Sequence, residues 1–217
     1  MKIAALREQI ARAHLHEAET GQLKARLEQQ LPHLHPLIQL PEPVAQGALN
    51  RFVTAYIEQV PELLEAANEV AREAGIESQI KPVLKIAEEY FITPPQIVDG
   101  QVGLDCLLDE AYLAHRLVEE INDLHIKHFQ QPLIPLDTTV ANLIAHQLIG
   151  EEFANQLDEV AHHSLDRMLD DESFALESVE AYRDKLSSPE TGAAWKRWPC
   201  LSRQLGVGLE LNQQQTA

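Results

Sequence analysis

The stretch that decides the fold is residues 104–129, LDCLLDEAYLAHRLVEEINDLHIKHF. Its apolar side chains recur every three or four residues, which places them along one side of an α-helix. They are Leu104, Leu107, Leu108, Ala111, Ala114, Val118, Ile121 and Phe129. A second helical pattern covers residues 138–169, with Phe153 and Val160 on its apolar face, and Pro132 and Pro135 mark the turn between the two. At ~1.5 Å per residue, we expect two antiparallel helices about 40 and 48 Å long.

Outward from this pair, the remaining sequence is also helical. Helices are expected at about 2–31 with a break at Gly21, then up to about Val60, and at 61–75, 77–91 and 173–186. A weak alternation over 207–211 predicts one short extended piece. The sequence therefore predicts an all-α fold: a bundle of six to seven helices with two long central antiparallel helices. We place the bundle at residues 1–190 and a C-terminal tail at 191–217 that packs on the bundle or on a partner.

The composition limits the classes of partner. The chain has 217 residues, 45% of them hydrophobic, and a formal net charge of −17. An acidic surface repels nucleic-acid phosphates and anionic lipid, so we expect neither as a partner. No apolar run approaches the ~18 residues of a membrane span. Cys106 and Cys200 are isolated and the first residues do not resemble a signal peptide, so we expect a cytoplasmic location.

Polar residues within the apolar stripes of the two long helices form the main functional lead. The most compact set is His115, Glu119 and Glu152, which His146 or Glu159 would extend. His115 and Glu119 are four residues apart, so one helical face can present both to a common ion. Imidazole together with carboxylate suits iron, manganese or zinc. The sequence therefore predicts a metal site, with iron or manganese as the expected cofactor, and the residues expected to orient its ligands are Tyr112, Asn122, Gln156 and His163.

Two further observations bear on this metal site. Glu88, beside an apolar stripe of an earlier helix, is a candidate for an additional carboxylate ligand. The long helices with internal Glu and His, including Glu159-Val-Ala-His162, resemble the ferritin-like and haem-oxygenase-like di-metal carboxylate proteins. That resemblance implies an iron-dependent oxidase or oxygenase acting on a small molecule in the bundle core. The chain departs from the ferritin-like pattern at Asn122, where a second Glu-x-x-His motif requires histidine.

The alternative interpretation is a non-catalytic acidic interaction protein. In that case the buried His and Glu residues form a hydrogen-bond network that stabilises the bundle. The segment Trp195-Lys196-Arg197-Trp198-Pro199-Cys200 holds both tryptophans and a local positive charge. It either packs back on the bundle or docks on another subunit, so a homodimer is one expected form of this alternative.

Overall fold

The computed structural model describes residues 1–41, 43–93, 103–130, 132, 138–168, 177–186 and 207–209. In these residues the fold is all-α, as predicted, with nine α-helices. They are α1 (Ile3–Thr20), α2 (Gln22–Gln30), α3 (Ala45–Glu58), α4 (Val60–Glu73), α5 (Glu77–Ile92), α6 (Leu104–Phe129), α7 (Thr139–Ile149), α8 (Glu151–Met168) and α10 (Glu177–Leu186). A 3₁₀ turn, η1 (Leu31–His33), follows α2. Within the ranges given above, no helix is long and apolar enough to cross a membrane.

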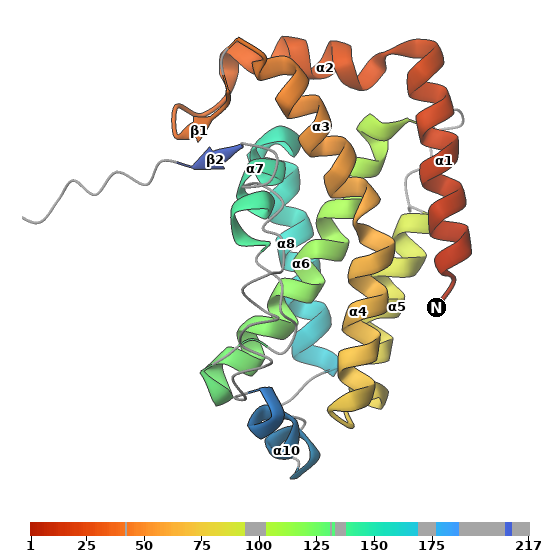
Figure 1. Cartoon of the computed structure of the whole chain (residues 1–217), viewed down its shortest axis with the longest axis vertical. Helices are drawn as coiled ribbons and strands as arrows, with labels where there is room; N and C mark the ends of the chain where they lie inside the picture. Colours follow the sequence, from red (N-terminus) through yellow and green to blue (C-terminus); the bar gives the residue numbers. More distant parts are fainter. Residues whose placement is uncertain are drawn as a thin grey trace, which may run out of the picture.

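Helix α6 lies at the centre of the bundle. Seven helices of the described chain pack against it: α1 to α5, α7 and α8. Figure 1 shows α6 in the middle, with α7 on one side and α1, α4 and α5 on the other. Its side chains Leu113, Leu117, Val118 and Ile121 are fully buried. Burying a leucine or isoleucine side chain contributes roughly 1.5–3 kcal/mol, so these residues stabilise the core.

A glycine ends α1 where the sequence predicted a break. Gly21 adopts the left-handed conformation (φ 64°), and its N–H bonds the carbonyl oxygen of Glu17 at 2.8 Å. The carboxylate of Glu17 in turn accepts hydrogen bonds from the backbone N–H groups of Leu23 and Lys24, at 2.8 and 3.1 Å. These bonds satisfy donors in the first turn of α2 that have no partner within the helix.

A second glycine divides the predicted second long helix. Gly150 has φ 105° and ψ 137°, a conformation that residues with a Cβ rarely adopt, and it separates α7 from α8. The prediction of one continuous helix over 138–169 was therefore wrong, and α6 is the longest helix in the described part of the chain. The break changes which face of α8 meets the core: Phe153 and Val160, expected on the apolar face, are exposed.

The last described segment of the chain forms a short two-stranded sheet with the segment that follows η1. Strands β1 (Ile38–Gln39) and β2 (Gly208–Leu209) pair antiparallel, with Ile38 opposite Leu209. The expectation of a short extended piece at 207–211 is therefore confirmed for β2. The predictions about Trp195 and Trp198 concern positions outside the described residues.

Candidate functional site

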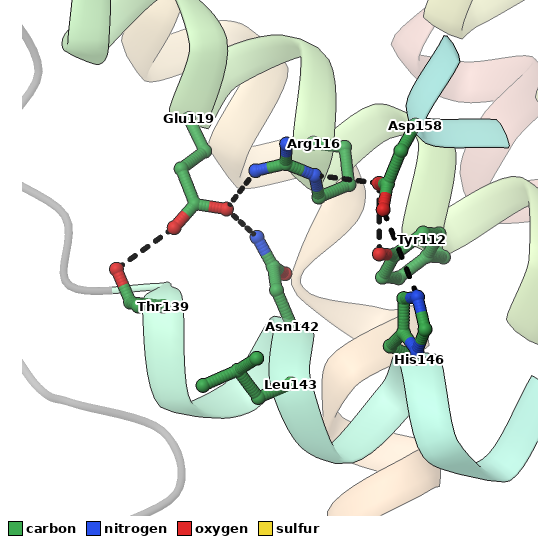
Figure 2. Close-up of a pocket in the computed structure, with 8 residues that line it drawn as sticks. All are labelled: Tyr112, Arg116, Glu119, Thr139, Asn142, Leu143, His146 and Asp158. Atoms are coloured by element: carbon green, nitrogen blue, oxygen red, sulfur yellow. Dashed lines mark hydrogen bonds and ion pairs between the residues drawn. The ribbon is translucent and has the colours of Figure 1, made fainter. Parts of the chain in front are cut away.

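A pocket of about 290 Å³ lies between α6, α7 and α8. Most of the residues that line it carry polar groups, and Figure 2 shows their side chains. Helix α6 contributes Tyr112, Arg116 and Glu119; α7 contributes Thr139, Asn142, Leu143 and His146; and α8 contributes Asp158. The pocket thus depends on the break at Gly150, since α7 and α8 approach α6 as separate helices.

Glu119 forms one wall of the pocket and is held by three donors. Its Oε2 atom accepts hydrogen bonds from Arg116 Nη1 and Asn142 Nδ2, both at 2.5 Å. Its Oε1 atom accepts one from the hydroxyl of Thr139 at 2.8 Å. These contacts tie α6 to the start of α7 and fix the carboxylate in one orientation (Figure 2).

Asp158 forms the opposite wall. Its Oδ1 atom accepts hydrogen bonds from Arg116 Nε at 2.8 Å and from the hydroxyl of Tyr112 at 2.9 Å. Its Oδ2 atom lies 3.8 Å from Nε2 of His146, whose ring also contacts Asn155 Oδ1 at 3.0 Å. Burial and then the hydrogen bond to Asp158 raise the pKa of Tyr112 well above its usual value, so this hydroxyl stays protonated and donates.

Arg116 stands at the centre of this charge cluster. Besides Glu119 and Asp158 it binds Glu120, with Nη2 to Oε1 at 2.6 Å. Only 17% of its side chain is exposed, against 13% for Glu119, 17% for Glu120 and 31% for Asp158. Burial alone would lower the pKa of Arg116, but Glu119 and Asp158 outweigh it and raise the value. One positive charge is therefore surrounded by three negative ones.

A buried extension of this network reaches α3. The hydroxyl of Tyr56 donates to Oδ1 of Asn142 at 2.7 Å, which directs the Asn142 amide NH₂ toward Glu119. The Tyr56 ring stacks on His115, with ring centroids 4.0 Å apart. Because the carbonyl oxygen of Tyr56 can only accept, its 3.0 Å contact with His115 requires a proton on Nε2. Burial lowers the pKa of His115 to about 4, so the imidazole is neutral.

The structure brings together one part of the residue set that the sequence predicted. Tyr112, Glu119 and His146 line the pocket, and His115 lies directly behind it against Tyr56. Asn122 is also buried on α6.

The remaining predicted residues lie apart from this group. Glu152, Gln156, Glu159 and His163 are exposed on α8, which the kink at Gly150 turns away from the expected register. The Nδ1 atom of His163 contacts the backbone carbonyl oxygen of Glu159 at 2.7 Å, whereas the metal hypothesis required the carboxylate of Glu159. Glu88 is buried, as its stripe suggested, but its Oε2 atom accepts from the backbone N–H of Lys2.

These positions do not suit the predicted metal centre. The Nε2 atom of His115 bonds to a carbonyl oxygen, and Oε2 of Glu119 already accepts two hydrogen bonds. Glu152 and Glu159 point into solvent, so they cannot complete a shared ligand set with His115 in this arrangement. Over the described ranges, no group of three or more His, Cys, Asp or Glu side chains is arranged to hold a metal ion.

Sequence reasoning missed the residues that organise the pocket. It did not single out Arg116, Glu120, Asp158, Thr139 or Asn142. One signal was present: Arg116 is followed by Glu119 and Glu120, at the i+3 and i+4 positions where a helix brings opposite charges together. The partners from α7 and α8 left no comparable pattern. No protein family model, curated protein or solved structure matches this chain.

Proposed function

We propose that this chain is a ligand-binding protein that holds a small polar molecule in the pocket between α6, α7 and α8. The observation that supports this most is the convergence of fixed polar side chains from three helices on one concave space of about 290 Å³. Ligand pockets run from about 300 to 1,000 Å³, so this one suits a small molecule.

The side chains of the pocket are held in place before any ligand arrives. Glu119 and Asp158 are each bonded by two or more donors, and Asn142 is oriented by Tyr56. A preorganised site loses less conformational entropy on binding, which favours affinity. Leu143 adds an apolar surface at the edge, and its 52% exposure leaves it accessible from solvent.

This proposal is closer to the alternative interpretation of the sequence than to the metal-dependent oxidase. The contacts of His115 and Glu119 support a hydrogen-bond network in the bundle, with a binding pocket at its edge. Iron or manganese binding, a homodimer and a cytoplasmic location stay predictions.

A fragment screen with a blocked variant tests the proposed function. Thermal shift and protein NMR with a library of small polar molecules should yield compounds that perturb the wild-type protein. Leu143→Trp places a large side chain at the pocket edge and should abolish these responses. Leu15→Trp is the matched control, because Leu15 is a leucine on α1 that is 68% exposed and lies outside the pocket lining. Responses that survive Leu143→Trp as well as they survive Leu15→Trp would contradict the proposal.

A further inference from the structure

The hydrogen-bond donors of the pocket are already directed at its carboxylates. Arg116 uses Nε, Nη1 and Nη2 on Asp158, Glu119 and Glu120. The hydroxyls of Tyr112 and Thr139 and the amide of Asn142 also bond to Asp158 or Glu119, and His146 Nε2 contacts Asn155 Oδ1. An anionic ligand would have to share these donors with acids that are already bound to them.

Acceptor capacity, in contrast, is left over on both walls. A carboxylate oxygen can accept two hydrogen bonds. Glu119 Oε1 receives one, from Thr139. Asp158 Oδ2 lies 3.8 Å from His146 Nε2, which is too long for a hydrogen bond. In Figure 2 these two carboxylates stand on opposite sides of the pocket, with Arg116 and Asn142 between them.

The charge balance points the same way. Three carboxylates around one guanidinium leave an excess of two negative charges, and the whole chain carries −17. The four side chains are between 13% and 31% exposed, so solvent screens this excess less than it would on an open surface. The excess attracts a cation and disfavours an anion.

We propose that the ligand is a small organic cation with a primary ammonium group and a short apolar chain. The ammonium donates to Asp158 Oδ2, the charge of Glu119 adds to the attraction from the opposite wall, and the apolar chain packs on Leu143. This inference rests on the proposed function, because it assigns the class of molecule that the same pocket takes.

Three probes of similar size and different charge test the ligand class: n-butylammonium, n-butanol and butyrate. NMR titrations at low ionic strength should show saturable shifts with n-butylammonium alone, and added salt should weaken the binding. Asp158→Asn should weaken it at least tenfold. Asp166→Asn is the matched control, since Asp166 lies on the same helix with 60% of its side chain exposed, and it should leave binding unchanged.

Two further variants keep the test decisive. If circular dichroism shows that Asp158→Asn does not fold, Glu120→Gln takes its place, because Glu120 contributes charge through Arg116 without lining the pocket. Glu120→Gln should weaken n-butylammonium binding severalfold, and an unchanged affinity would overturn the inference. Binding of n-butanol or butyrate as tight as that of n-butylammonium, lost in Leu143→Trp, would overturn the ligand class and leave the proposed function standing. If no probe and no library compound binds at the pocket, both proposals are wrong.

Discussion

The middle of α6 and its first two turns each hold several carboxylates and a nearby arginine, but the two arginines bind different groups. In the middle, Arg116 bonds directly to the carboxylates of Glu119, Glu120 and Asp158. Near the start, Arg26 donates to backbone carbonyl oxygens, those of Asp105 at 3.0 Å and of Leu148 at 3.2 Å.

The acids near the start of α6 consequently behave differently. Burial, opposed in part by Arg26, raises the pKa of Asp109 to about 6. Burial and then the charge of Asp109 raise the pKa of Glu110 to about 8, so Glu110 is largely protonated at neutral pH. In the described part of the chain, Glu110 Oε2 and Asp109 Oδ1 are buried without a hydrogen-bond partner. Arg26, which bonds to backbone carbonyl oxygens, therefore offsets the effect of burial on the pKa of Asp109 only in part.

Replacing Arg116, the central cation, should cause the largest loss of stability. The carboxylates in the middle of α6 would then lack a direct bond from an arginine, like those near its start. Arg116→Met leaves three carboxylates without their shared donor, and breaking such a buried ionic group costs about 3–5 kcal/mol. Urea denaturation at neutral pH measures this loss of unfolding free energy.

The matched control for this change is Arg72→Met. Arg72 pairs with Glu69 on α4, but its side chain is 61% exposed, and surface pairs contribute about 0–1 kcal/mol. Equal losses for Arg116→Met and Arg72→Met would show that the central cluster contributes no more than a surface pair.

The second prediction concerns Glu110 and the pH dependence of stability. Its pKa is about 8 in the folded protein and 4.5 in the unfolded chain, so the folded state binds the proton more tightly. The stability from this proton is complete below pH 4.5 and is lost as pH rises toward 8 and beyond. Between pH 6 and pH 8 the wild-type unfolding free energy should fall by about 2 kcal/mol from this group, since each pKa unit is worth ~1.4 kcal/mol.

Glu110→Gln isolates this contribution because glutamine has nearly the shape of protonated glutamate and does not titrate. Urea denaturation at pH 6 and pH 8 should show a smaller fall in the variant than in the wild-type protein. Glu89→Gln, at a position on α5 that is 60% exposed, should keep the wild-type slope. A wild-type slope in Glu110→Gln would mean that Glu110 is ionised in the folded protein.

Much of the fold followed from the sequence because its main signal is local. The spacing of Leu104, Leu108, Ala111 and Val118 predicted the central helix, and Gly21 predicted the end of α1. Gly150 was the exception: it fell within a regular apolar pattern, where a glycine can be either a helical residue or a break. The apolar pattern alone does not decide between the two, and the structure shows the break, with φ 105° at Gly150.

The site was less predictable for the same reason. Helical spacing correctly grouped His115 with Glu119 on the inner side of α6, but it could not show which partners would meet them. Asn142 and Asp158, which bond to Glu119 and Arg116, lie on α7 and α8, on either side of the break at Gly150. The metal hypothesis included Glu152 on the assumption of an unbroken helix, and the break left that residue exposed.

The smallest predicted effect is the coupling between Tyr56 on α3 and Asn142 on α7, which links the central cluster to the core. Tyr56→Phe removes the hydroxyl that donates to Asn142 Oδ1 at 2.7 Å and leaves that oxygen buried without its donor. The cost should be about 1–3 kcal/mol, mostly from the unsatisfied oxygen. Asn142→Leu in the Tyr56→Phe background should then cost less than it does in the wild-type protein, because that oxygen is already unpaired. A double-mutant cycle by urea denaturation measures the coupling, expected at about 1 kcal/mol. If the two losses simply add, Tyr56 and Asn142 act independently, and the polar network would stop at α7 without reaching the core around α3.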